Sequence, residues 1–424
     1  MKTKIADFIL YIIKKYYYLK GLCSKKNMVF FVPHSGMCRI DLYDIVNYKS
    51  DSALSFLHYV LENKLLLDRI LLVAICDDVE CTRYVKYVEE NYPGRKVSFI
   101  PLFANKSYSK MDKLYRHVEF CKNVSRSSHI FTSITHNFAG LISNQVLVDL
   151  NYFTCAMKND ILDKASPHYM GIEKVGHEYT YIVGTSEFAI RLTMPEMTLP
   201  YNRYVNMGLC RNDNLLNGEK CEWLREEIIE KVSYSVDTVV LYTPTHRDYE
   251  SKLNSNNVRS ILGFNYDAIK FADFLRTNGI VFICKLHPKQ NATVVESELP
   301  EGLILQKPDE RYGLTELMQI SDALVTDYTS VYFDYLLLDK PIIFNFYDLD
   351  IYKKERGVPC EPMSAISAGV IVNNEEEMKL ALLNLHNNEK DYSQMRRFVR
   401  NLFFTYQDTN TCKRVYEFIF GKAW

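Results

Sequence analysis

The chain has 424 residues, of which 47% are hydrophobic and 24% charged. This length predicts two or three domains, and the composition excludes a disordered or collagen-like chain. The 51 basic and 52 acidic residues nearly cancel. A nucleic-acid-binding protein usually carries a basic excess, so we expect no nucleic acid partner.

The first 27 residues form a basic segment in which seven Lys and one Asp, a local charge of +6, alternate with Ile, Leu, Phe and Tyr. The apolar run from Phe8 to Ile13 is short and ends at Lys14, which argues against a secretory signal, and no apolar run is long enough to span a membrane. We expect a basic amphipathic helix. It either lies on an anionic membrane surface or packs against the protein body with its basic side in water.

The rest of the chain alternates short β-rich runs with helical stretches such as Ser52–Asn63, Asp78–Glu90, Asp267–Thr277 and Glu375–His386. The predicted strands of the first half are Met28–Val32, Arg69–Ile75, Val97–Ile100, His129–Thr132, Tyr179–Val183 and Tyr204–Met207. Those of the second half are Thr238–Tyr242, Ile280–Cys284, Leu303–Leu305, Ala323–Thr326, Pro341–Phe346 and Gly369–Val372.

Continuous apolar strands separated by helices predict parallel sheets that are buried on both faces. Two such series predict an α/β protein with two Rossmann-type doubly wound domains facing a cleft, the GT-B-like architecture of B-type glycosyltransferases. The expected parts are the basic segment 1–27, an N-terminal domain 28–210, a C-terminal domain 211–391 and a helix 392–424 that crosses back to the N-terminal domain.

The eleven cysteines include no Cys-x-x-Cys motif, which argues against a zinc ribbon or a thioredoxin-like site. Their number is odd, and Cys76 and Cys284 lie inside apolar runs. Reduced, buried thiols of this kind predict a cytoplasmic protein.

Polar residues cluster directly after predicted strands, where an open α/β sheet places its ligand site. The run Ala323–Thr326 is followed by Asp327, Thr329 and Ser330 and then by a helix. A capping hydroxyl, the free N–H groups of the first turn and the helix dipole together favour a phosphate. Asp334, one turn further on the same face, is a candidate for holding a hydroxyl. A plain N-cap with an exposed Asp is the alternative interpretation.

A second cluster follows the run Ile280–Cys284 and reads Lys285-Leu286-His287-Pro288. The two-residue period of a strand places Lys285 and His287 on the same side. This pair suits the charge of a pyrophosphate leaving group, and His287 suits proton transfer. A surface His at a strand end is the alternative.

Two further clusters complete the set: Pro244, Thr245, His246 and Arg247 after Thr238–Tyr242, and Arg211 and Asp213 after Tyr204–Met207. The cations, hydroxyls and ionisable groups of the four clusters fit an anionic nucleotide-activated donor. No carboxylate pair for a divalent metal stands out at a strand end of the second half. We therefore expect no metal site and no essential cofactor, with Arg, Lys and helix dipoles balancing the charge.

The segments TVVLYTPTHRD, VFICKLHP and ISDALVTDYTSVYFDYLLLDKPIIFNFYDLDIYKKERG resemble the CDP-glycerol glycerophosphotransferase family. This family comprises the polymerases and primases of wall teichoic acid, with relatives that make teichoic-like capsules. The segment MGLCRND resembles the family's Gly-x-Pro-Arg-x-Asp segment, with Cys210 in place of Pro. The resemblance covers about residues 28–400 and is dense from 203 to 357.

Residue by residue, the resemblance implies donor contacts and a base. The family's base is a His in a Trp-His-Gly segment of the first domain. His136, in SITHNFAG, is the preferred candidate, and His34, in VPHSG, is the alternative. The donor contacts that match the family's motifs are Arg211, Pro244, Thr245, Lys285, His287, Thr329, Ser330 and Asp334.

The resemblance implies transfer of a polyol phosphate from CDP-glycerol or CDP-ribitol to a hydroxyl of a cell-surface glycopolymer or its lipid-linked precursor. The hydroxyl attacks the β-phosphorus, CMP leaves and His136 accepts the proton. The N-terminal domain would bind the acceptor and the C-terminal domain the donor, on the inner face of the bacterial cytoplasmic membrane. Two alternatives stay open: a GT-B glycosyltransferase that uses a CMP- or UDP-sugar in capsule or lipooligosaccharide synthesis, and a non-catalytic capsule-assembly subunit. The oligomeric state stays open as well.

Overall fold

A computed structural model of the chain describes residues 2–24, 26–33, 48–75, 78–101, 109–133, 142, 144–151, 157, 179–194, 199–217, 221–245, 247, 262–263, 266–286, 299–306, 312–358 and 360–421. The chain divides into two compact units. The first unit comprises Met1–Phe153, Gly171–Asn214 and Asp408–Trp424, and the second comprises Thr154–Met170 and Leu215–Gln407. The domain limits 27, 210 and 391 that the sequence suggests stay predictions.

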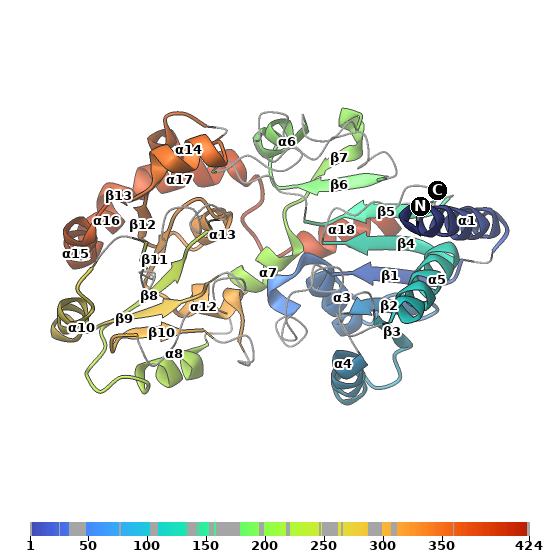
Figure 1. The fold of residues 1–424 in the computed structure, drawn as a ribbon, viewed down its shortest axis with the longest axis horizontal. Helices are drawn as coiled ribbons and strands as arrows, with labels where there is room; N and C mark the ends of the chain where they lie inside the picture. The colour runs from blue at the N-terminus through green and yellow to red at the C-terminus, as the bar shows by residue number, and fades with distance from the viewer. Residues whose placement is uncertain are drawn as a thin grey trace. The chain divides into compact units, whose positions relative to one another are not determined.

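The first unit is built on a seven-stranded parallel sheet with the order β3-β2-β1-β4-β5-β6-β7 (Figure 1). Its strands are β1 Met28–Val32, β2 Ile70–Ile75, β3 Val97–Pro101, β4 Ser127–Thr132, β5 Val146–Asp149, β6 Tyr181–Gly184 and β7 Tyr204–Asn206. The order reverses between β1 and β4. This is the topological switch point, at whose carboxyl edge such sheets bind ligands.

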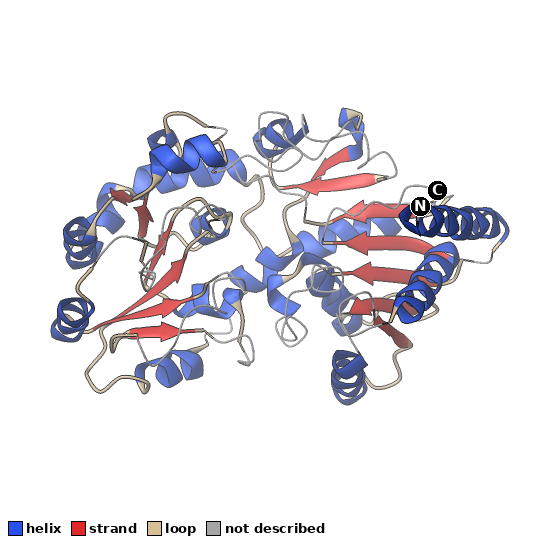
Figure 2. Ribbon diagram, in the orientation of Figure 1, coloured by secondary structure: helices blue, strands red, loops and turns tan. Residues whose placement is uncertain are grey.

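Helices cover both faces of this sheet (Figure 2). On strand β1, Val29 and Phe31 join the core that contains α3 and α18, whereas Phe30 meets Phe120 of α5 on the other face. The helices are α1 Lys2–Cys23, α3 Ser52–Glu62, α4 Asp78–Asn91, α5 Lys110–Arg126, α6 Glu187–Thr193, α7 Cys210–Leu216 and α18 Thr411–Phe420, with 3-10 turns at Tyr48–Ser50 and Tyr201–Arg203.

The second unit contains a six-stranded parallel sheet with the order β10-β9-β8-β11-β12-β13. Here the order reverses between β8 and β11. The strands are β8 Thr238–Thr243, β9 Ile280–Cys284, β10 Leu303–Leu305, β11 Ala323–Thr326, β12 Ile342–Asn345 and β13 Val370–Val372. The helices are α8 Glu222–Ile229, α10 Ala268–Thr277, α12 Leu314–Ile320, α13 Val331–Leu336, α14 Leu349–Glu355, α15 Glu375–Leu383, α16 Leu385–Asp391 and α17 Ser393–Phe403, with a 3-10 turn at Met363–Ala365.

Two parallel doubly wound sheets confirm the α/β fold class predicted from the alternating strands and helices. Strand β5 was not predicted. Its four residues, Val-Leu-Val-Asp, end in a carboxylate, and Asn144 and Gln145 precede them, so polar residues leave only three consecutive apolar positions. Pairing with β4 and β6 places it in the sheet.

A buried histidine lies between α3 and α4 in the first unit. His58 is 1% exposed, and its ring nitrogens lie 2.8 Å from the Tyr84 hydroxyl and 3.1 Å from that of Tyr92. Burial lowers the pKa of His58 to about 3, because the imidazolium would lose its hydration. The neutral ring is therefore part of the folded state.

We expect this histidine to make the first unit sensitive to mild acid. Above pH ~6.5 the ring is neutral in both states; below that pH the unfolded chain takes up a proton that the folded chain takes up only near pH 3. The free energy of unfolding should thus fall by about 1 kcal/mol per pH unit from this residue alone. Urea unfolding between pH 7 and pH 5 measures the slope. If the free energy of unfolding of His58→Gln fell with pH as steeply as that of the wild type, His58 would not be the source of the acid sensitivity.

Candidate functional site

The carboxyl edge of the second sheet brings together residues from several of the predicted clusters. At the switch point, β8 and β11 end side by side, with Thr243 paired to Thr326. Their hydroxyl oxygens lie 3.2 Å apart in the interior, and the Thr326 hydroxyl donates to the Thr243 carbonyl at 3.1 Å. The loops that follow the two strands therefore leave the sheet from a fixed common base.

Asp327, directly after β11, organises the loop after β8. Its carboxylate accepts the Thr245 backbone N–H at 2.9 Å and the Thr245 hydroxyl at 2.7 Å. It also accepts the N–H of Tyr328 at 2.5 Å and Nη1 of Arg247 at 2.5 Å. The side chain is 2% exposed, so its role in this structure is to hold the loops, and Thr245 is held by it.

Arg247 is buried as well, at 3% exposure. Its Nε and Nη2 donate to the two carboxylate oxygens of Asp348 at 2.9 and 3.0 Å, and its Nη1 donates to the Thr245 carbonyl at 2.5 Å. Burial opposes the charge, but the carboxylates of Asp327 and Asp348 outweigh it and raise the pKa of Arg247 further above its usual value. The guanidinium is permanently charged and makes four hydrogen bonds to protein acceptors.

Aromatic rings enclose this guanidinium. It lies 5.1 Å from the ring centroid of Tyr328 and 5.4 Å from those of Tyr347 and Tyr352. Tyr328 and Tyr352 stack at 3.6 Å, and the Tyr328 hydroxyl donates to Asp348 at 3.2 Å. Burial, followed by the neighbouring Asp348, raises the pKa of Tyr328, so this hydroxyl stays protonated.

Lys285 directly follows β9, the other neighbour of β8 in the sheet. Its Nζ donates to the side-chain oxygen of Gln306 at 2.9 Å, and its backbone N–H donates to the Tyr242 carbonyl at 2.9 Å. Lys285 is half-buried, and because β9 pairs with β8 in parallel it lies at the same carboxyl edge as Thr245. The predicted residues His246 and His287 lie outside the described residues.

Thr329, Ser330 and Asp334 belong to the β11–α13 connection. Helix α13 spans six residues, so its dipole is small, and Ser330 occupies the N-cap position without a side-chain capping bond. The Thr329 hydroxyl accepts the Val331 N–H at 3.4 Å. Asp334, predicted on the Ser330 face, is 5% exposed. Thr329 and Ser330 remain half-buried beside the Asp327 network.

Arg211 and Asp213 lie in the first unit, on α7. Arg211 donates to the Asn151 side chain beyond β5. Asp213 accepts the backbone N–H groups of Thr411 and Cys412 at 2.9 and 2.7 Å, which caps α18 from a distant part of the chain. Burial raises the pKa of Asp213 against the opposing effect of these bonds. The structure therefore groups this pair with the first unit and gives Asp213 a structural contact.

We expect Asp213→Ala to lower the free energy of unfolding by about 1–2 kcal/mol, because two N–H groups at the start of α18 lose their acceptor. Urea denaturation measures this change. Asp68→Ala is the matched control: Asp68 is 79% exposed in its pair with Arg69, and such a pair contributes less than ~1 kcal/mol. Equal effects of the two substitutions would contradict the capping role.

The two candidate bases follow the strands that flank the switch point of the first sheet. Val32 of β1 pairs with Thr132 of β4. Ser133 donates its hydroxyl to Asp51 at 2.8 Å and accepts the Ala53 N–H at 2.7 Å, which anchors the exit from β4 to the start of α3. Both His34 and His136 lie outside the described residues.

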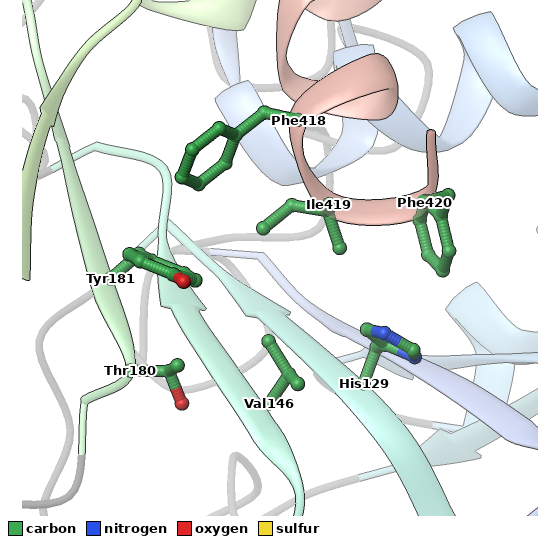
Figure 3. A pocket seen from close by; sticks show the side chains of 7 residues that line it. All are labelled: His129, Val146, Thr180, Tyr181, Phe418, Ile419 and Phe420. Atoms are coloured by element: carbon green, nitrogen blue, oxygen red, sulfur yellow. The ribbon is translucent and has the colours of Figure 1, made fainter. Parts of the chain in front are cut away.

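A cavity of about 400 Å³ lies at the opposite, amino-terminal edge of the first sheet. His129, Val146 and Tyr181 extend from the sheet toward the end of α18 (Figure 3). Burial, and then the charge of Arg69, lower the pKa of His129 to about 4. Because β4, β5 and β6 begin here, the cavity lies away from the edge where open α/β sheets bind ligands.

Sequence reasoning did not identify Asp348, Gln306 or Asn151 as partners of the candidate residues. Asp348 follows β12 in the segment FNFYDLD, and a carboxylate shortly after a buried strand was the available signal. Within the described part of the chain, no group of three or more His, Cys, Asp or Glu is arranged to hold a metal ion. None of the described helices has both the length and the apolar character to cross a membrane.

A sequence model of the CDP-glycerol:poly(glycerophosphate) glycerophosphotransferase family matches residues 82–421 of the chain. A teichoic acid glycerol-phosphate primase of Bacillus subtilis is 26% identical over 248 residues, 58% of this chain and 59% of the relative. A teichoic acid glycerol-phosphate transferase of Staphylococcus aureus is 26% identical over 253 residues, 59% and 62% of the two chains. The chain thus matches about three-fifths of the length of these relatives.

The fold is shared with solved structures of the wall teichoic acid polymerase TagF. For one variant the TM-score is 0.73 at 18% identity, over 98% of this chain and 95% of that chain. Another structure, of a TagF variant soaked with CDPG, gives a TM-score of 0.72 over 98% of this chain. The likeness at this identity establishes the architecture of two Rossmann-type domains.

Proposed function

The chain belongs to the CDP-glycerol:poly(glycerophosphate) glycerophosphotransferase family, and from this premise we propose that it transfers glycerol phosphate from CDP-glycerol to an acceptor hydroxyl. The acceptor is a hydroxyl of a cell-surface glycopolymer or of its lipid-linked precursor. The observation that carries the proposal is the family match over residues 82–421, which includes all four strand-end clusters. CDP-ribitol is the alternative donor of the same chemical class.

The proposed reaction is a displacement at phosphorus. The acceptor oxygen bonds to the β-phosphorus, the bond from that phosphorus to the bridging oxygen breaks, and CMP leaves with the electron pair. His136 accepts the hydroxyl proton. Most of the catalysis would come from positioning and from charge stabilisation.

The second unit supplies the proposed donor contacts. Lys285 directly follows β9 at the carboxyl edge, and Thr245 is held at the neighbouring strand end by Asp327. Half-buried Thr329 and Ser330 follow in the next loop. An ammonium and the hydroxyls of Thr329 and Ser330 are donors of the kind that a pyrophosphate accepts. His287, two residues after Lys285, would stabilise the leaving CMP, and Arg211 remains a donor contact proposed from the family resemblance.

A donor panel tests the proposal. The full chain is incubated with a lipid-linked saccharide acceptor and, separately, with CDP-glycerol, CDP-ribitol, a CMP-sugar or a UDP-sugar. We expect acceptor-dependent CMP release with CDP-glycerol and an acid-labile phosphodiester in the product. Turnover with the CMP- or UDP-sugar alone would identify a glycosyltransferase, and no turnover with any donor would favour a non-catalytic assembly subunit.

We also propose that α1 binds the anionic cytoplasmic surface of the bacterial membrane, where a lipid-linked acceptor would lie. Ile9, Ile12, Tyr16 and Leu19 are 41%, 50%, 56% and 61% exposed. Their spacing of three, four and three residues aligns them along one face of the helix. Lys15 and Lys20 contact neighbouring Tyr rings, which keeps their ammonium groups beside this apolar stripe. Such a face favours the interface of an anionic bilayer.

Leu19→Glu is expected to abolish most binding to vesicles of 30% phosphatidylglycerol in phosphatidylcholine, because a carboxylate replaces a leucine in the stripe and repels the surface. Co-sedimentation measures bound protein. The control is Leu380→Glu on α15, since Leu380 is also 61% exposed. Equal sedimentation of the two variants would contradict membrane binding through α1.

A further inference from the structure

One guanidinium connects the three loops that follow neighbouring strands of the second sheet. Arg247, after β8, donates to Asp327 after β11 at 2.5 Å and makes a bidentate pair with Asp348 after β12 at 2.9 and 3.0 Å. Strands β8, β11 and β12 are consecutive in the sheet. The three residues are distant in sequence, so this contact sets the spacing of the loops at the carboxyl edge.

A contribution to stability alone is a weak explanation for the buried cluster of Arg247, Asp327 and Asp348. The side chains of Arg247, Asp327 and Asp348 are 1%, 3% and 5% exposed. The loss of hydration on burying such charges offsets much of their attraction, so well-packed apolar residues would stabilise the fold as well or better. A bidentate guanidinium pair does supply a defined distance and orientation between two backbones, which apolar packing supplies less strictly.

Arg247, Asp327 and Asp348 hold residues that are proposed to contact the donor. Asp327 accepts both the N–H and the hydroxyl of Thr245 at 2.9 and 2.7 Å. The same carboxylate accepts the Tyr328 N–H at 2.5 Å, one residue before Thr329. Any movement of Arg247 is therefore transmitted to the hydroxyls of both loops. The guanidinium itself is enclosed by tyrosine rings and directed at carboxylates.

We infer that Arg247, with Asp348, is a positioning residue that sets the geometry of the donor-binding loops without touching the donor. This inference rests on the proposed function of the same edge. It differs from the sequence-based interpretation, in which Arg247 binds the substrate directly. A misplacement of binding groups by about 1 Å lowers turnover by up to roughly 100-fold.

The test compares Asp348→Asn and Tyr328→Phe with Arg396→Lys. Asp348→Asn keeps the shape of the side chain and removes its charge, and Tyr328→Phe keeps the ring and removes the 3.2 Å bond to Asp348. Arg396 is the matched control, because it is a second buried guanidinium of the same unit, 1% exposed and bonded to Asp339 at 3.0 Å. Each variant is assayed for CMP release at a temperature where circular dichroism shows it folded.

We expect Asp348→Asn to raise the KM for CDP-glycerol roughly 10- to 100-fold with an unchanged KM for the acceptor, and Tyr328→Phe to raise the donor KM a few-fold. Arg396→Lys should lower the unfolding temperature with wild-type kinetics. Wild-type donor KM in folded Asp348→Asn, or in Tyr328→Phe if Asp348→Asn does not fold, would overturn the inference. Absence of CMP release by the wild-type chain would instead refute the proposed function.

Discussion

His287→Ala is expected to lower the kcat for CMP release from CDP-glycerol by about 10²–10⁴-fold. The residue follows Lys285 by two positions, and the structure places Lys285 at the carboxyl end of β9, beside the loop that carries Thr245. A histidine there would stabilise the charge on the departing CMP, an interaction that grows in the transition state and therefore affects kcat.

The matched control is His386→Ala, which removes an exposed histidine from α16 of the same unit. Steady-state assays with saturating acceptor measure both variants. We expect wild-type kcat for the control. Turnover by His287→Ala within a few-fold of the wild type would contradict the role of His287 in the reaction.

His136→Ala is expected to abolish transfer to a similar extent, about 10²–10⁴-fold, and to leave CDP binding intact. The two candidate bases follow β4 and β1, whose ends pair through Thr132 and Val32 at the switch point of the first sheet. In the sequence, His34 follows the last residue of β1 by two positions and His136 follows that of β4 by four. Removal of the base affects the attack by the acceptor and leaves the donor contacts of the second unit in place.

His34→Ala separates the two assignments. We expect it to retain kcat within a few-fold, with calorimetric titration of CDP giving the same Kd for both variants and the wild type. The opposite outcome, with His34→Ala inactive and His136→Ala active, would move the base to His34.

The sheets were predictable because parallel strands buried on both faces consist of consecutive apolar residues. The run Ile280–Cys284, for example, was predicted with the bounds that β9 has in the structure. Strand β5 lacked that signal, since its four residues include Asp149, and its place depends on pairing with β4 and β6. The sequence pattern therefore predicts a strand well when all the residues of that strand are apolar.

The sequence allowed us to predict which loops carry the candidate site. Clusters after β8, β9 and β11 were found from polar residues at strand ends, and the structure brings these strand ends to one edge. The sequence did not allow us to predict which side chains of these loops bond to one another. Arg247 and Asp348 are about a hundred residues apart, as the bond between them shows, and no local period connects them. Likewise, Asp213 caps α18 across 198 residues of chain.

The donor's β-phosphorus provides the most direct measurement of the proposed chemistry. CDP-glycerol labelled with ³²P at the β-phosphate is incubated with the full chain and a lipid-linked saccharide acceptor, and the label is followed in nucleotide and product. Attack at the β-phosphorus predicts labelled glycerol phosphate on the acceptor and one unlabelled CMP per transfer. Label retained in released CDP, with unlabelled product, would show that the bond broken lies between glycerol and phosphate, and would contradict a glycerophosphotransferase.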